Sequence, residues 1–373
     1  MDVYDELGVT KMINGSATLT ALGGSLMPPE VLAAMAEAAR HFVEIDELQR
    51  KVGAKIAEWT HNEAAYVSCG AAAGLVLATA ACIAGTDPAK RERLPHAEGM
   101  ANEVIVHRHG RVGYDFAVRQ VGAKLVEIGS EAGTSAQEME EAISDRTAAI
   151  FYFYNVTRMK GLVPLEEAIP IAHRHGVPLI VDAAAQIPPV ENLWRFTHMG
   201  ADLALFSGGK GLCGPQSSGL ILGRKDLIEA CAFHVCPRPF IGRPMKVGKE
   251  ELVGLMAAVK WYLSLDHAAL MASYEAQVQY AIDAFSSWSG VSAQRCFPSE
   301  AGQPMPRAEI AFDEEALGLT RDEILAQLRA GSPSIALAAA GKHGVYLNPQ
   351  TLQPGEVETI VSRIKQVIAA QPS

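Results

Sequence analysis

The sequence lacks the features that mark nucleic-acid-binding and metal-binding proteins. No run of lysine and arginine is longer than two residues, and the net charge of the 373-residue chain is −10. Phosphate backbones and anionic membranes need a concentrated positive surface, so such partners are not expected. The six cysteines include no CxxC pair, which disfavours a disulfide framework and a structural zinc site. We therefore expect reduced thiols and no metal.

Long apolar runs and a secretory signal are also missing. Residues 1–15 contain no basic segment followed by an apolar stretch, which is the pattern of a signal peptide. The longest apolar stretches, such as residues 71–84, are too short and too rich in alanine to cross a bilayer. The chain is therefore expected to be cytoplasmic, with neither a membrane nor a nucleic acid as partner.

The composition is that of a globular protein, with 49% hydrophobic and 20% charged residues. From residue 64 onward, short β-branched runs alternate with helical patterns. This alternation predicts an α/β fold in which helices cover both faces of a mostly parallel sheet. Seven strands are expected, at residues 64–68, 103–107, 123–129, 148–155, 177–185, 201–207 and 218–223.

The pattern of the sequence changes near residue 250. Two long helical patterns follow, at 249–265 and 267–285, and then a proline-rich turn region and a short α+β tail. We expect a large α/β domain and a smaller α+β C-terminal domain. The predicted parts are an N-terminal segment that contacts both domains (1–45), the large domain (46–250) and the small domain (251–373).

One lysine, Lys210, lies among glycines directly after an apolar run, in the segment SGGKG. A phosphate-binding P-loop requires G-x-x-x-x-G-K-[ST]. Here Ala204 occupies the first position and Gly211 follows the lysine, so that motif is excluded. Two interpretations remain: a solvated turn, or a lysine that bonds covalently to a cofactor. In the second case the glycines would give the lysine room to move.

Asp182 favours the cofactor interpretation. It ends a neighbouring predicted strand, where a buried carboxylate is costly unless it meets a cation. A lysine that forms a Schiff base and an aspartate that pairs with a pyridine nitrogen are the two fixed requirements of pyridoxal phosphate. The segment SCGAAAG opens the next predicted helix, and its backbone N–H groups suit a phosphate. The candidate cofactor-binding residues are Lys210, Asp182, Ser68, Cys69, Gly70, Ala71, Ser207 and Gln186.

On these motifs the chain resembles the fold-type I pyridoxal phosphate enzymes. Within them it is similar to the group that contains bacterial selenocysteine synthase and D-glucosaminate-6-phosphate ammonia-lyase. The resemblance runs from residue 14 through VDAAAQIPP and FSGGKGLCGPQSSGL to VYLNPQTLQPGE, nearly the whole chain. It implies that Lys210 is linked to the cofactor and that Asp182 is the partner of the ring nitrogen. It also implies a homodimer or larger assembly with active sites at subunit interfaces.

Several polar residues near other predicted strand ends are further candidates. After the strand 103–107, His109 is expected to stack on the cofactor or act in acid–base chemistry, and Arg108 to bind substrate. His107 is the less favoured alternative, and the whole group could instead be a solvated loop. The H-x-H pair has no carboxylate nearby, which disfavours a metal site.

A cluster of basic residues follows the cofactor lysine in the otherwise acidic chain. Arg243, the preferred member, and Lys246 are the candidates for binding a carboxylate or phosphate of the substrate, which the cluster could reach across a dimer. A solvated loop before a helix is the alternative. Asn155 ends the predicted strand 148–155 and is a further candidate for the substrate site.

The residues indicate the cofactor more clearly than they indicate the reaction. Removal of the Cα proton by Lys210 could lead to elimination, racemisation or transamination. The resemblance points to α,β-elimination on a small hydroxylated 2-amino acid, including a 2-amino sugar acid, to give a 2-oxo acid and ammonia. Transfer on a tRNA is disfavoured, because the chain is acidic and the segment INGS begins as early as Ile13.

Overall fold

The structure is a computed structural model that describes residues 2–370. Contacts divide the chain into two compact units. The larger comprises Met27–Ser264 and Ala301–Gln303, and the smaller comprises the chain up to Leu26, Leu265–Glu300 and the chain from Pro304 onward. Each unit is described separately below. Within the described residues, no helix combines the length and apolarity that a membrane span requires.

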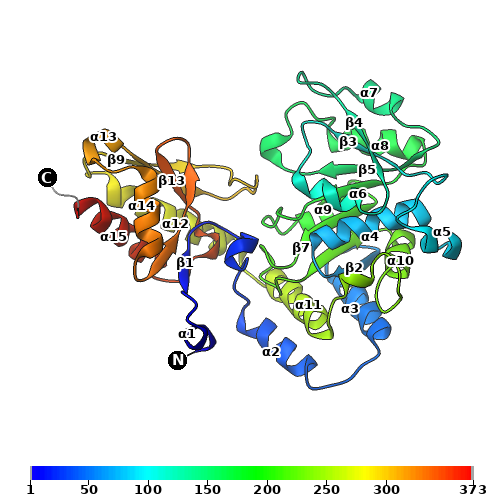
Figure 1. The fold of residues 1–373 in the computed structure, drawn as a ribbon, viewed down its shortest axis with the longest axis horizontal. Coiled ribbons are helices and arrows are strands. Elements are labelled where there is room, and N and C mark those ends of the chain that lie inside the picture. Colours follow the sequence, from blue (N-terminus) through cyan, green and yellow to red (C-terminus); the bar gives the residue numbers. More distant parts are fainter. Residues whose placement is uncertain (1, 371–373) are drawn as a thin grey trace. The chain divides into compact units, whose positions relative to one another are not determined.

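The larger unit is built on the predicted seven-stranded sheet (Figure 1). The order of its strands is β2 (Ala64–Ser68), β8 (Gly219–Gly223), β7 (Leu203–Ser207), β6 (Leu179–Asp182), β5 (Thr147–Phe153), β3 (Glu103–His107) and β4 (Lys124–Ile128). Strands β7, β6, β5, β3 and β4 run parallel to one another, whereas β8 runs antiparallel to both of its neighbours. The sheet is therefore mixed at one edge, because β8 follows β7 through a turn rather than through a crossover helix.

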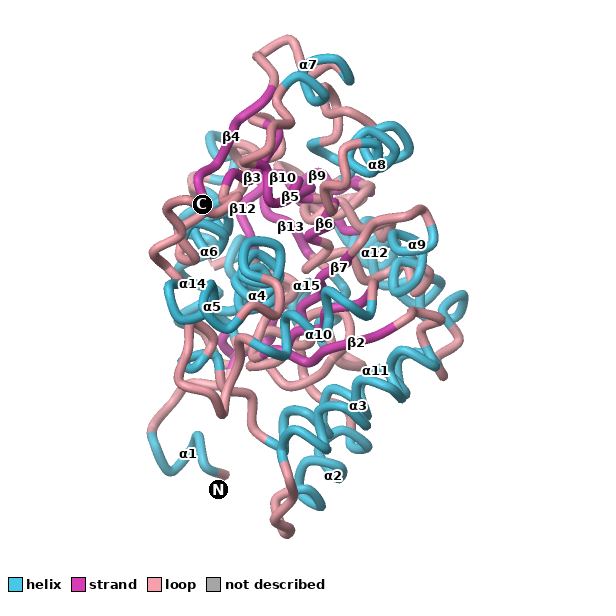
Figure 2. Tube along the Cα trace, turned by 90° about the vertical axis from the view of Figure 1, so that its right-hand side faces the viewer, coloured by secondary structure: helices cyan, strands magenta, loops and turns pink. Residues whose placement is uncertain are grey.

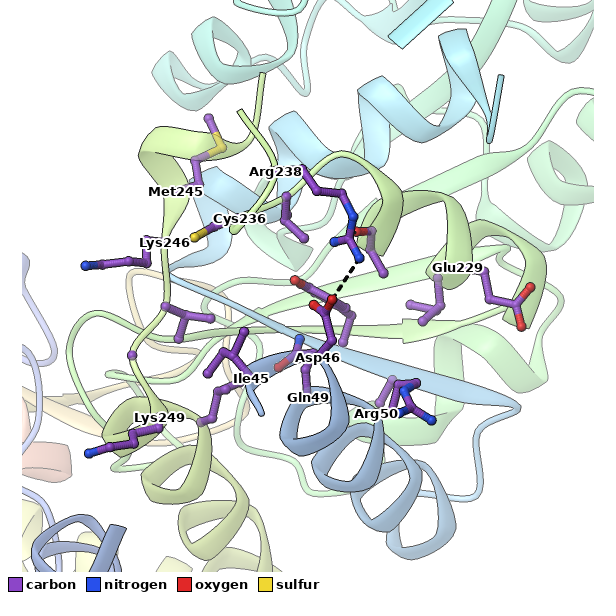
Figure 3. Close-up of a pocket in the computed structure, with 18 residues that line it drawn as sticks. Ile45, Asp46, Gln49, Arg50, Glu229, Cys236, Arg238, Met245, Lys246 and Lys249 are labelled. Carbon is purple, nitrogen blue, oxygen red and sulfur yellow. Dashed lines mark hydrogen bonds and ion pairs between the residues drawn. The ribbon is translucent and has the colours of Figure 1, made fainter. Parts of the chain in front are cut away.

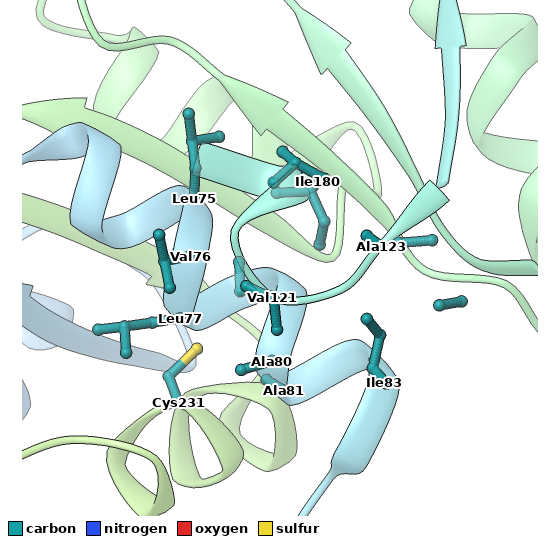
Figure 4. Packing of buried hydrophobic residues seen from close by; sticks show 14 of the residues in the cluster. Leu75, Val76, Leu77, Ala80, Ala81, Ile83, Val121, Ala123, Ile180 and Cys231 are labelled. Carbon is teal, nitrogen blue, oxygen red and sulfur yellow. The ribbon is translucent and has the colours of Figure 1, made fainter. Parts of the chain in front are cut away.

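Helices pack on both faces of this sheet because its strands are apolar on both sides. In β7, Leu205 belongs to the cluster around α4 (Ala71–Ala84), whereas Phe206 packs near Phe196 of α9 (Asn192–His198). Successive strand residues point to opposite faces, so α4 and α9 lie on opposite sides. Helix α4 is apolar all round and is buried among α6 (Phe116–Arg119), α10 (Lys225–Phe233) and the sheet (Figure 4).

Three further helices of the larger unit pack side by side: α2 (Pro29–Ala38), α3 (Ile45–Trp59) and α11 (Lys249–Leu263) (Figure 2). Since α11 packs on α2 and α3, it belongs to this unit, and the chain leaves it after Ser264 rather than near residue 250. The remaining helices of the unit that exceed one turn are α5 (Pro88–Arg93), α7 (Ala136–Glu141) and α8 (Leu165–Arg174).

The smaller unit has its own core around a four-stranded antiparallel sheet. The first strand of the chain, β1 (Met12–Asn14), pairs with β11 (Ser334–Ala336), so the N-terminal segment is divided between the units at Leu26 rather than kept as one part to residue 45. The sheet order is β12 (Ala338–Ala340), β13 (Gly344–Leu347), β10 (Arg307–Phe312) and β9 (Val291–Cys296), and the longer helices are α12 (His267–Phe285), α14 (Arg321–Ala330) and α15 (Glu356–Ala369).

Candidate active site

The strand register brings three of the predicted groups to one edge of the sheet. Gly219, the first residue of β8, pairs with Ser68 at the end of β2 and with Ser207 at the end of β7. In the next pair, Asp182 at the end of β6 lies opposite Leu205. The carboxyl ends of β2, β7 and β6 therefore meet, which is where open α/β sheets bind their ligands.

Asp182 is a buried carboxylate with few partners. Its side chain is embedded, with 8% of the residue exposed, and Oδ1 accepts a hydrogen bond of 3.0 Å from the N–H of Ala184. Burial raises the pKa of Asp182, and the positive charge of Lys210 opposes this rise only in part. Such a carboxylate is ready to receive a cationic group.

Lys210 lies in the turn between β7 and β8. The carbonyl of Lys210 accepts a hydrogen bond from the N–H of Cys213 (2.9 Å), which closes the turn. Burial lowers the pKa of the Lys210 amine, and Asp182 opposes this in part. Among the described residues, no ion pair joins the two groups within 4.0 Å. A half-buried lysine near a buried aspartate disfavours the interpretation as a solvated turn.

The glycines around Lys210 allow close packing of the turn. A Cβ on Gly211 would lie 2.2 Å from the carbonyl oxygen of Ile187, and one on Gly208 would lie 2.0 Å from Oγ of Ser218. Both approaches are far shorter than a carbon–oxygen contact allows. These two glycines are therefore required by neighbouring backbone and side chains, and not simply to give the lysine room to move, as the sequence suggested.

The segment SCGAAAG forms the expected N-terminus of α4. Gly70 is the N-cap, with φ 149°, and no side chain caps the first turn. The Ser68 hydroxyl donates to the carbonyl of Gly70 (2.8 Å), so it holds the loop in shape, and the half-buried Cys69 thiol has its pKa raised by burial. The first four backbone N–H groups of an α-helix have no hydrogen-bond acceptor within the helix, so they attract an anion.

These residues fit pyridoxal phosphate in three respects. The uncapped N-terminus of α4 suits the phosphate, the buried and raised-pKa Asp182 suits a protonated ring nitrogen, and Lys210 supplies a primary amine whose pKa burial lowers. Ser207 lies at the same edge, and its N–H is bonded to the carbonyl of Ala184 (3.2 Å).

Gln186, a predicted cofactor-binding residue, lies in the loop after β6. It is buried, and its Nε2 donates to the carbonyl of Ala301 (2.8 Å). Its carboxamide is thus tied to a segment more than a hundred residues away in the sequence. Sequence reasoning missed that segment, Ala301–Gln303, because nothing in its residue types signals a contact with the loop after β6.

The histidine loop after β3 separates into a buried and an exposed part. His107 is 2% exposed, and its Nε2 accepts the N–H of Val163 (3.3 Å). Burial lowers the pKa of His107 to about 4, so it is neutral at physiological pH. His109 is exposed in the following turn, and the exposed Arg108 lies near Glu127 (3.9 Å). The structure assigns no direct contact with Lys210 to either residue.

Asn155 lies close to the candidate site. The N–H of its neighbour Tyr154 donates to the carbonyl of Asp182 (2.9 Å), so the two strand ends are bonded together. The side chain of Asn155 turns toward Thr157, with Oδ1 accepting from the backbone N–H (2.9 Å) and the hydroxyl (2.7 Å).

The two basic candidates, Arg243 and Lys246, belong to the larger unit. Arg243 and Lys246 are exposed, on the segment that precedes α11. Lys246 lines a cavity of about 530 Å³ beside β2, across which Arg238 and Asp46 form an ion pair of 2.8 Å (Figure 3). Neither Lys210 nor Asp182 lines this cavity, so within one chain Lys246 is not brought to the candidate site.

Comparison with known proteins settles the family. A sequence model of L-seryl-tRNA selenium transferase, SelA, matches residues 12–273. The chain belongs to this family. It is 36% identical to D-glucosaminate-6-phosphate ammonia lyase of Salmonella typhimurium, over 98% of both chains. It is 35% identical to 5'-C-glycyluridine monooxygenase-decarboxylase of a Streptomyces species, over 98% of this chain and 92% of the relative.

Solved structures agree with this assignment. A structure of D-glucosaminate-6-phosphate ammonia-lyase superposes with a TM-score of 0.87 at 35% identity, covering 99% of this chain and 98% of that one. A serine palmitoyltransferase with bound pyridoxal phosphate, at 12% identity and a TM-score of 0.58, shares the fold. The predicted family, the fold-type I class with its mostly parallel sheet, and the pyridoxal phosphate cofactor are thereby confirmed, and β8 is the antiparallel strand of that sheet.

Proposed function

We propose that the chain is a pyridoxal-phosphate-dependent ammonia-lyase that acts on a hydroxylated 2-amino acid, in particular a 2-amino sugar acid. The observation that carries this proposal is that the buried Asp182 and Lys210 lie near each other at the edge that holds the uncapped N-terminus of α4. The relative of 36% identity, which matches over the full length, supports the reaction and the substrate class.

Each group has a role in holding the cofactor. Lys210 would bind it covalently through Nζ, and Asp182 would keep a proton on the ring nitrogen. The backbone N–H groups at Gly70 and Ala71 and the Ser207 hydroxyl would bind the phosphate. Bound in this way, the cofactor withdraws electrons from Cα of an amino acid and makes the Cα proton acidic.

Once the amine of the substrate has replaced Lys210 on the cofactor, the released Lys210 amine would act as the base. Burial lowers the pKa of its amine, so a larger fraction is unprotonated near neutral pH than for an exposed lysine. Nζ takes the proton from Cα, and departure of the β-hydroxyl as water needs an acid. We assign the role of this acid to His109, in the exposed turn after β3. Products are a 2-oxo acid and ammonia after hydrolysis.

Substrate contacts and assembly complete the proposal. Arg108 and Asn155 would contact the substrate from the strand ends of this chain. Arg243 and Lys246 are exposed, and we assign them to the anionic groups of a substrate in a neighbouring subunit of a homodimer or larger assembly. A cytoplasmic location is part of the same proposal.

A second reaction has a specific observation in its favour. The monooxygenase-decarboxylase is 35% identical, almost as similar as the ammonia lyase. Overall identity therefore does not separate elimination from loss of the carboxylate. Racemisation and transamination also begin with the same proton removal. Transfer on a tRNA is least favoured, since a selenium transferase of Nitratidesulfovibrio vulgaris is 28% identical and is covered over 57% of its length.

Product analysis distinguishes these reactions. The holoenzyme is incubated with phosphorylated and unphosphorylated 2-amino sugar acids in deuterated water, and ammonia, 2-oxo acid, carbon dioxide and Cα deuterium are measured. Equal amounts of ammonia and 2-oxo acid, absent with Lys210→Ala, are the expected result. Carbon dioxide release would favour decarboxylation, and deuterium at Cα of both enantiomers without ammonia would favour racemisation. Either of these results would overturn the ammonia-lyase proposal.

A further inference from the structure

The tripeptide Ala301–Gln303 is packed into the larger unit although the chain on both sides of it belongs to the smaller one. It forms part of the connection between β9 and β10. Gln303 is 2% exposed, and its Nε2 donates to the carbonyl of Ile187 (2.7 Å). The carbonyl of Ala301 accepts from Gln186 (2.8 Å). Two hydrogen bonds thus fix the loop that follows Asp182.

The loop held by Gln303 lies directly against the turn of the catalytic lysine. The carbonyl oxygen of Ile187, which Gln303 binds, is the atom that leaves no space for a Cβ on Gly211. Gly211 is the residue after Lys210. A shift of this carbonyl would therefore move the backbone of the lysine turn, because close-packed interiors transmit such displacements.

The middle residue of the tripeptide packs against the neighbouring strand end. Gly302 has φ +79°, and a Cβ there would lie 2.5 Å from Oδ1 of Asn155 and 2.9 Å from the N–H nitrogen of Val156. One short segment therefore fixes both loops of the candidate site, the one after β5 that carries Asn155 and the one after β6 that carries Asp182.

We propose that Ala301–Gln303 sets the geometry of the active site, with Gln303 as a positioning residue for the Lys210 turn and Gly302 as the space that Asn155 requires. The inference rests on the proposed function in that Lys210 and Asn155 act on cofactor and substrate. Removing the Gln303 carboxamide leaves the buried carbonyl of Ile187 without this donor, a loss that the surrounding loop can relieve only by moving.

Gly302→Ala and a matched glycine test the contact with Asn155. Gly318 also has positive φ (+60°), lies in the smaller unit and has open space where a Cβ would be. Gly318→Ala therefore introduces the same backbone strain without a clash. We expect Gly302→Ala to lower kcat about 10-fold or more, with Gly318→Ala within about 2-fold of the wild type. Equal kcat for the two variants would overturn the role of Gly302.

Gln303→Ala tests the contact with the lysine turn, with Gln277→Ala, which removes an exposed side-chain hydrogen bond in α12, as control. The readout is the pH midpoint for reaction of Lys210 Nζ with acetic anhydride in cofactor-free protein, followed by peptide mass spectrometry. The midpoint should move upward in Gln303→Ala, because a looser loop admits water to Nζ. A midpoint equal to that of the wild type would contradict the role of Gln303.

Failure of the ammonia-lyase proposal and failure of the inference about Ala301–Gln303 can be distinguished. Chemical reactivity of Lys210 does not depend on which reaction the holoenzyme catalyses, so the midpoint measurement stands if the lyase proposal fails. Conversely, a holoenzyme that releases ammonia while Gln303→Ala and Gly302→Ala match their controls would refute this inference alone. If Gly302→Ala fails to fold, the Gln303→Ala measurement decides the proposal.

Discussion

Two buried aspartates at opposite ends of neighbouring strands have different surroundings. Asp202 precedes β7 at the amino end, accepts the N–H of Leu179 (2.7 Å) and pairs with Arg224 (2.6 Å) and His173 (3.0 Å). Asp182 ends β6 at the carboxyl end, and the hydrogen bond from Ala184 is the one that the described residues give its side chain. Burial raises the pKa of Asp182.

The difference supports the proposal that Asp202 is a structural carboxylate and Asp182 a functional one. Asp202 has partners for both oxygens, so it stabilises the fold by joining two strands and a helix. The free-energy cost of burying the Asp182 carboxylate is offset only in part by its hydrogen bond. Proteins retain such a cost at sites where a bound ligand supplies the missing hydrogen-bond or charge partner. Burial alone would not have distinguished them, because both are nearly inaccessible.

Replacing Lys210 should have the largest effect. Lys210→Ala removes the covalent link and the base together, so turnover should fall by about 10³-fold or more. Ammonia release by the holoprotein is the measurement. Added methylamine should restore a part of the rate, because the missing group is a primary amine. Retention of full turnover by Lys210→Ala would exclude the mechanism.

Asp182→Asn should lower turnover by about 10²-fold and yet stabilise the cofactor-free protein. The raised pKa of Asp182 means that the folded state binds this proton more readily than the unfolded state, so the stability of the cofactor-free protein falls as pH rises through the folded pKa. At neutral pH the amide should gain about 1–3 kcal/mol in the free energy of unfolding. Urea titrations of both proteins at pH 5 and pH 8 measure it, and a less stable variant at pH 8 would contradict the comparison.

Asp202→Asn should show the opposite pattern. It removes charged partners from Arg224 and His173, which are both partly exposed, so the free energy of unfolding should fall by about 2 kcal/mol. Turnover per folded molecule should stay within about 2-fold of the wild type. A large loss of turnover without a loss of stability would show that the two aspartates are not distinguished as described.

Ala72→Glu tests the proposed phosphate site at the N-terminus of α4 and should have the smallest effect. A negative charge at a helix N-terminus stabilises the helix, but here it would repel the phosphate, so pyridoxal phosphate should bind about 10-fold more weakly. Ala72→Gln, of similar size without the charge, is the control. Equal cofactor affinity in the two variants, measured by equilibrium dialysis, would place the phosphate elsewhere.

The sequence predicted the parts of the site that depend on strand order. Asp182 and Ser68 each end an apolar strand, and Lys210 lies in the turn after one, so the strand ends carry all three to one edge of the sheet. The direction of β8 was not predictable in the same way, because an apolar run reads alike in either orientation. The boundary at Ser264 depends on α11 packing on α2 and α3, which a change in sequence pattern does not report.

Side-chain pairings between distant segments could not be predicted. Gln186 reads as a residue near the cofactor, but its Nε2 is bonded to Ala301. His107 and His109 are alike in sequence, yet one is buried against Tyr152 and the other is exposed. In each case the deciding partner lies on another element, so a local pattern carries no information about it.

The central claim is that Lys210 carries the cofactor at the carboxyl edge of the sheet. The most direct measurement is to equilibrate the protein with pyridoxal phosphate, reduce it with borohydride and locate the modified lysine by peptide mass spectrometry. We predict one modified peptide that contains Lys210, with its yield reduced in Asp182→Asn. Modification of other lysines at the same extent, or a protein that remains unmodified, would contradict the account.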